Sequence, residues 1–195
     1  PIGTGSLTIG AGGTVDLNAH NFGDATQTSG TIPSITMSGT GTSASTLATL
    51  TNSSTATGVT VYGGITLTQN GSGLYDIISQ ATGATLTSTG VIANSASGTP
   101  TQLQIGTSGN AGTVILGNGS TASTYSGGTT VAYGTLRAAG NASAFGSAKV
   151  TVNDGATLDV YGYAIANDID LSGTGVSSAG ALQNTNTGQG SVPTL

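Results

Sequence analysis

The chain of 195 residues has no cysteine, no tryptophan and few charges, since only 5% of its residues are Asp, Glu, Lys or Arg. An ordinary soluble domain carries about 25% charged residues. The lack of cysteine excludes disulfides, zinc–thiolate sites and thiol catalysis. All seven acidic residues are aspartates, and Arg137 and Lys149 are the only basic residues apart from one histidine. Because phosphate backbones and anionic lipids bind clustered cations, this composition excludes nucleic acid as a partner.

Long apolar runs are also missing. No stretch approaches the roughly 20 consecutive apolar residues of a transmembrane helix. Residues 1–10 contain neither a basic region nor an apolar region of the kind found in secretory signal peptides. We therefore expect no membrane insertion of this segment.

Small residues dominate what is present. The chain contains 34 glycines, 36 threonines and 23 serines, which together make nearly half of it. Glycine and serine richness is typical of flexible linkers, but disordered chains usually combine low hydropathy with high net charge. This chain has a mean hydropathy of +0.15. Its apolar residues also follow a pattern, which argues for a folded core.

The pattern is a triplet in which two aliphatic residues flank a small or polar one. Alternation with period two is typical of a short strand with one buried face. We predict a strand of three to five residues at each of nine triplets: Leu7–Ile9, Val15–Leu17, Ile35–Met37, Val59–Val61, Ile65–Leu67, Leu103–Ile105, Val150–Val152, Leu158–Val160 and Ile169–Leu171.

Turn-forming residues separate the triplets, as at Asn70-Gly71 and Asp154-Gly155. No window shows helical spacing of apolar residues over two turns, and the only helical candidate is a single turn at 142–145. The sequence therefore predicts a nearly all-β chain. Very short strands with only eight aromatic residues suit stacked layers around a narrow core better than a wide sandwich.

Internal similarity supports a repetitive architecture. Residues 3–31 match residues 146–174 at a constant offset, with Asp16 aligned to Asp159 and Gly12 to Gly155. Residues 32–111 show only the rhythm of triplets. We expect one β-solenoid domain over 1–195, with repeat-like units at about 3–31 and 112–174 and irregular layers at 32–111.

The residues of the second unit resemble a known repeat. The motif consists of Gly112-Thr-Val-Ile-Leu-Gly117, Thr124-Tyr-Ser-Gly-Gly-Thr-Thr-Val131, Gly134-Thr-Leu136, Ala144-Phe-Gly-Ser147 and Gly155-Ala-Thr-Leu-Asp-Val160. It is similar to the autotransporter-associated β-strand repeat of bacterial passenger domains. The resemblance implies a right-handed parallel β-helix that is exported and lies outside the cell or on the outer-membrane surface of a Gram-negative bacterium.

Candidate catalytic and metal-binding residues are few. His20 lies near Asp16 and Asp24, so a hydrolytic triad is conceivable, but no Gly-x-Ser-x-Gly element accompanies it, and a polar turn after Leu17 is the simpler interpretation. Asp154, Asp159, Asp168 and Asp170 raise the alternative of a polysaccharide-cleaving acidic pair. The middle residues Asp159 and Asp170 are instead predicted to point outward into solvent. A calcium repeat at 12–16 lacks the required recurrence. We assign no catalytic, cofactor-binding or metal-binding residue and expect a non-enzyme.

Surface residues leave three alternatives open. Tyr125, Tyr133, Tyr161 and Tyr163 could form a platform for a glycan or a surface, although such tyrosines more often cover layer edges with wet hydroxyls. Threonines at strand centres, including Thr8, Thr60, Thr66 and Thr151, are predicted to project outward in arrays that could bind ice. Asn52, Asn70, Asn118 and Asn141 precede x-Ser and could accept a glycan.

Neither terminus resembles a cap, because Pro1–Gly3 leads directly into a strand and Val192–Leu195 is apolar. We expect the ends to continue into neighbouring repeats or to stack head to tail with identical chains. The predicted function is that of an extracellular structural stalk or fibre module that contributes to adhesion. The alternative is a secreted polysaccharide-binding or polysaccharide-degrading β-helix protein.

Overall fold

The structure is a computed structural model that describes residues 5–26, 32–40, 46–56, 58–68, 75–96, 100–117 and 121–186. These residues form short strands and no α-helix. The strands are β1 (Leu7–Ile9), β2 (Thr14–Asp16), β3 (Ile35–Met37), β4 (Thr49–Asn52), β5 (Val59–Val61), β6 (Ile65–Leu67), β7 (Tyr75–Ser88), β8 (Ile92–Asn94), β9 (Gln102–Ile105), β10 (Ala111–Leu116), β11 (Thr129–Val131), β12 (Thr135–Ala138), β13 (Val150–Val152), β14 (Thr157–Asp159), β15 (Ile169–Leu171) and β16 (Leu182–Gln183).

Every pairing between these strands is parallel, and the pairings form three ladders. Ladder A is β1-β3-β6-β8. Ladder B is β2-β4-β7-β9-β11-β13-β15, and it uses the first half of β7. Ladder C is β5-β7-β10-β12-β14-β16, and it uses the second half of β7. The long strand β7 therefore joins ladders B and C into one sheet.

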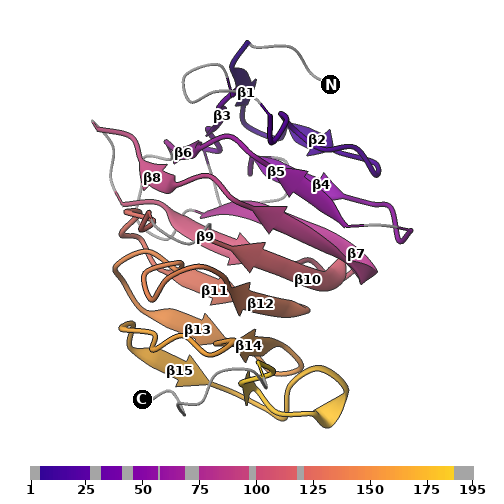
Figure 1. Ribbon diagram of the computed structural model, residues 1–195, viewed down its shortest axis with the longest axis vertical. Helices are drawn as coiled ribbons and strands as arrows, with labels where there is room; N and C mark the ends of the chain where they lie inside the picture. The colour runs from indigo at the N-terminus through magenta and orange to yellow at the C-terminus, as the bar shows by residue number, and fades with distance from the viewer. Residues whose placement is uncertain are drawn as a thin grey trace.

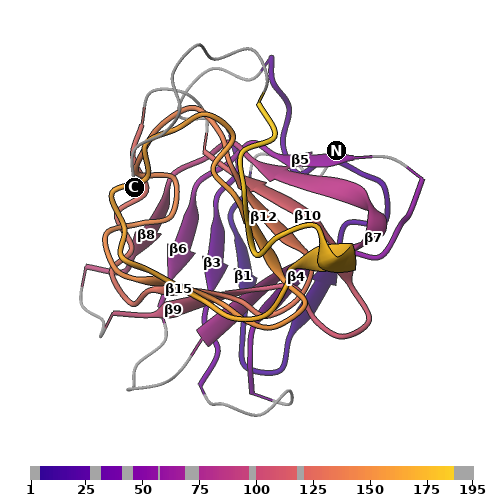
Figure 2. The same ribbon diagram turned by 90° about the horizontal axis from the view of Figure 1, so that it is seen from below.

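From β3 to β10 the chain visits ladders A, B and C in turn, whereas from β11 to β16 its strands alternate between ladders B and C. Each circuit forms one layer. Leu7 pairs with Ile35, and Val150 pairs with Ile169, which means that ladder neighbours are separated by a whole circuit. Figure 1 shows the strands stacked along the long axis, with β1 at one end and β15 at the other. Figure 2 shows the ladders surrounding a common interior. A nearly closed arrangement of parallel strands fits a parallel β-helix or a closed barrel.

The core lies inside the three ladders and follows the predicted alternation. In β12, Leu136 is fully buried, whereas the neighbouring Arg137 faces outward. The inward residues are mostly Ile, Leu, Val and Ala, and they form one cluster that runs from Ile9 to Ala181. Each layer thus adds a few aliphatic side chains to a continuous narrow core.

Seven of the nine predicted triplets lie within strands, six with the predicted bounds and Leu103–Ile105 inside β9. The triplets at 15–17 and 158–160 are shifted, because β2 and β14 each begin and end one residue earlier. The strand β7 contains none of the predicted triplets, and it has 14 residues and passes from ladder B to ladder C. Gly83 lies within β7 with φ 89°, a conformation that favours glycine at this corner.

The predicted helical turn at 142–145 is a turn rather than a helix, and within the described ranges the one helical element is a 3-10 turn at Val176–Ser178. The predicted turn at Asn70-Gly71 lies outside the described residues, as do the two ends of the unit at 3–31.

The internal repeat is visible in local backbone structure. Gly12 and Gly155 have φ 71° and 77°, and the aligned pair Asn18 and Tyr161 has φ 41° and 47°. The two units nevertheless occupy different ladders, since β1 lies in ladder A and the aligned β13 in ladder B. The repeat therefore encodes a strand–turn–strand unit rather than a position in the layer.

A buried amide pair connects three layers near the junction of ladders B and C. Asn52 and Gln80 are fully buried. Asn52 Nδ2 donates to Gln80 Oε1 at 3.0 Å, and Asn52 Oδ1 accepts from the Ala19 amide at 2.9 Å. Gln80 Nε2 donates to the Ser54 carbonyl oxygen at 3.2 Å. Buried amides need such partners, so this pair fixes the stacking of these layers.

The alternation can be tested by truncating an inward and an outward side chain on neighbouring strands of ladder C. Leu136→Ala removes a fully buried side chain and should lower the free energy of unfolding by about 2–5 kcal/mol. Ile115 pairs with the outward Arg137 and is half-buried, so Ile115→Ala should cost clearly less. Urea denaturation measures both. Equal losses would contradict the assigned faces.

Candidate functional site

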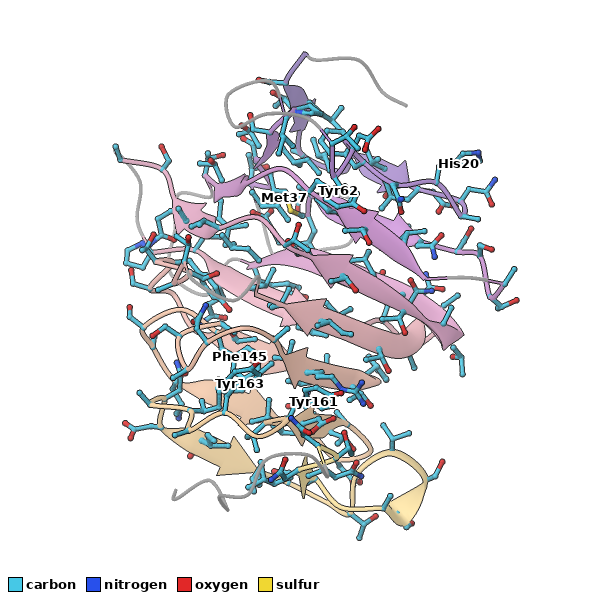
Figure 3. All side chains as sticks on the ribbon, viewed as in Figure 1. His20, Met37, Tyr62, Phe145, Tyr161 and Tyr163 are labelled. Carbon is cyan, nitrogen blue, oxygen red and sulfur yellow. The ribbon has the colours of Figure 1, made fainter. Side chains whose placement is uncertain are left out.

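His20 lies in an exposed turn that extends from the body of the molecule (Figure 3). Its Nδ1 atom is 2.7 Å from the Asn18 carbonyl oxygen. The Asp16 carboxylate accepts from the Asn18 and Ser53 amides at 3.0 and 2.9 Å, and Asp24 accepts from the Thr26 amide at 2.9 Å. These bonds hold each group in its own turn. The prediction of a polar turn after Leu17 is confirmed.

Asp16 and its repeat counterpart Asp159 make the same set of hydrogen bonds. Each Oδ1 accepts from the amide two residues later, Asn18 or Tyr161, at 3.0 Å. Each Oδ2 accepts from a hydroxyl of the next layer, Ser53 or Thr185, at 2.5 Å. We call these two sites the carboxylate clamps. Each clamp fixes its own turn and ties the following layer to it.

The electrostatics of Asp16 follow from this geometry. Burial raises the pKa of its carboxyl, but the hydrogen bonds from Ser53 and Asn18 together outweigh burial and hold the pKa below its ordinary value. The carboxylate is therefore stabilised in its charged form.

The prediction that Asp159 points into solvent is wrong. It faces away from the core, as predicted, but its side chain is only 1% exposed. Arg137 Nε donates to Asp159 Oδ2 at 2.8 Å, and the guanidinium lies 4.7 Å from the centroid of the Tyr161 ring. Arg137, Tyr161 and Thr185 thus cover the carboxylate. This cluster depends on contacts between layers, which the sequence does not display.

The remaining aspartates near the C-terminal end do not join Asp159. Asp154, Asp168 and Asp170 are exposed, and Asp170 pairs with Lys149. Asp170 lies on ladder B and Asp159 on ladder C. The charge and hydrogen bond of Asp170 raise the pKa of Lys149. Within the described ranges no three His, Cys, Asp or Glu residues gather where they could hold a metal ion.

A carboxylate that the sequence did not single out lies in the interior. Asp76 in β7 is fully buried. It lies two residues before the buried Ile78, on the same face of the strand. Its Oδ1 accepts from the Gly39 amide at 3.2 Å. The bond joins ladder B to the segment that follows β3. Asp76 thus serves the packing between neighbouring parts of the chain.

The tyrosines do not form one platform. Tyr125 is fully buried, and its hydroxyl lies 2.7 Å from Thr129 Oγ1. Burial raises the pKa of the Tyr125 hydroxyl above its ordinary value, and the bond to Thr129 offsets this only in part. The predicted wet hydroxyl is therefore wrong for Tyr125. Tyr133 is 45% exposed, and Tyr163 packs against the core.

The predicted outward threonines lie on different ladders: Thr8 and Thr66 on ladder A, Thr60 on ladder C and Thr151 on ladder B. On ladder A, Thr36 is the register partner of both Thr8 and Thr66, and none of the three is buried. The column ends at Ala93, the partner of Thr66 in β8. Ser34 Oγ donates to Ser6 Oγ at 3.2 Å beside this column. Strands β1, β3, β6 and β8 contain no charged residue. The outside of ladder A is thus an uncharged hydroxyl surface.

Two of the four possible glycan acceptors are described, and the side-chain amide nitrogen of each donates a hydrogen bond. Asn52 is buried, with its amide nitrogen bonded to Gln80. Asn141 Nδ2 donates to the Thr121 carbonyl oxygen at 3.1 Å. Asn70 and Asn118 lie outside the described residues.

One hollow lies where loops replace the strands of ladder A, and another lies at the C-terminal end. The first, of about 370 Å³, is lined by small residues from three layers, including Ser123, Ser143 and Asn167. The second, of about 260 Å³, is lined by Ile165, Asn167, Asp168, Ile169, Leu171 and Leu182. No helix among the described residues has the length and apolar character needed to cross a membrane.

The two ion pairs offer a matched test of the cluster around Asp159. Arg137→Leu leaves a buried carboxylate without its cation and should lower the free energy of unfolding by about 3 kcal/mol. Lys149→Leu removes an exposed pair and should cost less than about 1 kcal/mol. Guanidinium denaturation at neutral pH measures both. A loss as small for Arg137→Leu as for Lys149→Leu would contradict the role of the cluster.

No family model, curated protein or solved structure matches the chain. The similarity to the autotransporter-associated repeat therefore rests on the motif residues between 112 and 174.

Proposed function

We propose that the fold is a right-handed parallel β-helix and that the chain is a structural segment, a stalk or fibre-forming module, of an extracellular bacterial protein. The observation that carries this proposal is the parallel, in-register stacking of layers along the long axis around one continuous core. A β-helix explains why each strand pairs with strands one circuit away. In such a stack each added layer lengthens the molecule by about 4.8 Å without widening it.

The motif residues support a structural function because they serve packing. Tyr125 is buried and bonded to Thr129. A Cβ atom at Gly127 would lie 2.2 Å from the Thr101 carbonyl group of the layer above, so only glycine fits there. Phe145 is also fully buried. The most distinctive part of the motif thus specifies contact between layers.

The outer surface suits a stalk. It is rich in threonine and serine hydroxyls and carries few charges, so electrostatic repulsion between neighbouring molecules is weak. The proposed location outside a Gram-negative cell is supported by the similarity of residues 112–174 to the autotransporter-associated repeat. Contribution to adhesion is part of the same proposal.

Duplicating one layer tests the stalk directly. Residues 129–149 comprise β11, β12 and the connection to β13, which is one circuit. Inserting three further copies after residue 149 should lengthen the particle by about 14 Å at constant cross-section. Small-angle X-ray scattering measures both dimensions. A glycine–serine insertion of equal length is the control and should leave the length of the rigid part unchanged.

A wider cross-section would instead indicate a barrel and would overturn the β-helix.

The location is tested separately, by adding protease to intact cells that make the full natural polypeptide. Loss of an epitope within residues 121–186 is expected, and protection of that epitope until the cells are lysed would contradict an extracellular stalk.

A second candidate function, ice binding, is favoured by the register of Thr8, Thr36 and Thr66 on ladder A. Ordered water at an ice surface is matched best by a rigid, uncharged surface with regularly spaced hydroxyl and methyl groups. Parallel strands fix this spacing at about 4.8 Å across the ladder. Here the function would belong to the outer surface of the same stack.

Thermal hysteresis tests this second function. The purified chain should shape ice crystals and delay their growth, and Thr36→Lys should abolish the effect because it places a charge in the middle of the column. Thr121→Lys, at an exposed position outside the ladders, should leave the effect unchanged. Absence of hysteresis in the wild-type chain at high concentration would remove this function.

A further inference from the structure

The exposed turn between β13 and β14 contains the one aspartate of this chain that is followed by glycine. The residues after the seven aspartates are, in chain order, Leu17, Ala25, Ile77, Gly155, Val160, Ile169 and Leu171. The main-chain amide that follows an aspartate is a nucleophile within reach of the side-chain carboxyl carbon, and a side chain on the following residue hinders its approach. Glycine has no side chain and the widest conformational freedom. Asp154 therefore has the least hindered neighbouring amide.

The conformation of this turn depends on the main chain and on Gly155. The Ala156 amide donates to the Asn153 carbonyl oxygen at 3.0 Å, and Gly155 has φ 77°. A positive φ at the third residue of a turn closed in this way is typical of a type II turn, which favours glycine there. All three residues 153–155 are exposed. The turn thus leaves the Asp154 carboxylate in contact with water.

The aligned repeat unit forms the same turn without a carboxylate. Residues 10–13 align with 153–156, and the Gly13 amide donates to the Gly10 carbonyl oxygen at 2.9 Å. Gly12 has φ 71°. Ala11 stands in the place of Asp154. The carboxylate at residue 154 is therefore not needed to form the turn.

Neither reacting group has a partner in the described part of the chain. Four other aspartates accept hydrogen bonds from main-chain amides, and Asp170 pairs with Lys149. Among the described residues the Asp154 carboxylate makes no hydrogen bond or ion pair, and the Gly155 amide has no acceptor. A group that is held by hydrogen bonds must lose them before it reacts, so these two groups start without that cost.

Asp168 provides a comparison within the same chain. It is exposed like Asp154, and within the described ranges its carboxylate makes no hydrogen bond. It is followed by Ile169, which lies in β15 and pairs with Val150. The branched Cβ atom of isoleucine and the fixed strand hinder the approach of this amide to the carboxyl carbon. The two exposed aspartates thus differ in the residue that follows and in its place in the fold.

We propose that Asp154 and Gly155 form a site of spontaneous isoaspartate formation. The Gly155 amide nitrogen loses its proton and attacks the side-chain carboxyl carbon of Asp154. A C–N bond forms and the carboxyl oxygen leaves as water, which gives a cyclic succinimide. Water then opens the ring. Opening at the side-chain carbonyl restores aspartate, and opening at the main-chain carbonyl gives isoaspartate, so the net reaction is an isomerisation that needs no oxidant and no cofactor.

Isoaspartate changes the corner between ladders B and C. The main chain then runs through the side-chain β-carbon, which adds one carbon atom to a turn whose flanking strands are held by the neighbouring layers. The Asp154 side chain also lies against Gly173 of the next layer, where a Cβ atom would be 1.7 Å from Asp154 Oδ1. Isomerisation moves this carboxylate and should therefore loosen the contact between the two layers.

The test follows the folded chain during weeks of incubation at physiological temperature. After incubation, trypsin cleavage at Lys149 releases residues 150–195, which contain both exposed aspartates. Electron-transfer fragmentation in a mass spectrometer distinguishes isoaspartate from aspartate at each position. Isoaspartate should accumulate at Asp154 about tenfold faster than at Asp168, because the glycine amide is unhindered and the Ile169 amide is not.

Asp154→Glu and Asp154→Ala are the control variants. Glutamate keeps the charge but must close a larger and slower ring, and alanine is the residue of the aligned turn. Both should fold and stay unmodified at residue 154, and after incubation both should keep a higher urea midpoint than the wild-type chain. An equal midpoint would contradict the effect on the stack. Accumulation at Asp154 no faster than at Asp168, or only in chain unfolded by urea, would overturn the proposal.

Discussion

Every other feature of the structure depends on the parallel, in-register pairing of each layer with the next. Backbone hydrogen bonds hold neighbouring layers together only if equivalent residues stay opposite one another, as Val150, Thr151 and Val152 stay opposite Ile169, Asp170 and Leu171. A shift by one residue would turn the aliphatic side chains outward and the polar ones inward. The register therefore fixes the core and the outer surface at once.

The few charged groups act within this constraint. The carboxylate clamps at Asp16 and Asp159 repeat one set of bonds in two ladders, each to its own turn and to a hydroxyl in the next layer. Their surroundings differ, because Arg137 and Tyr161 cover Asp159, whereas Asp16 is exposed. The two aligned aspartates thus differ in their surroundings: Asp16 forms a clamp at the surface, and Asp159 is the buried partner in an ion pair. A carboxylate with its oxygens in use for stacking is poorly suited to general acid or base work.

The sequence predicts the local elements well and the contacts between layers poorly. Alternation within three residues is a local signal, and it placed β13 and β15 with their observed bounds. Its limits appear at β7, where residues 76–81 are all buried before the corner at Gly83, and at Asp159, whose burial requires Arg137 from the preceding layer and Thr185 from the following one. Asp16 and Asp159 occupy the same position in the two aligned units, and this identity is the sequence feature that indicates the carboxylate clamps. Its meaning becomes clear only when the hydrogen bonds to Ser53 and Thr185 are known.

The same constraint explains why this chain has few charged side chains and regularly stacked layers. Inside the stack, space between layers is so limited that glycine is required at Gly127 and the polar groups of Asn52 and Gln80 bond to each other. Outside, six of the three-residue strands carry threonine at their centre, a β-branched residue that favours extended backbone and offers a hydroxyl without charge. The flanks of such a molecule carry many hydroxyl groups and few charges, among them the exposed Asp170–Lys149 pair.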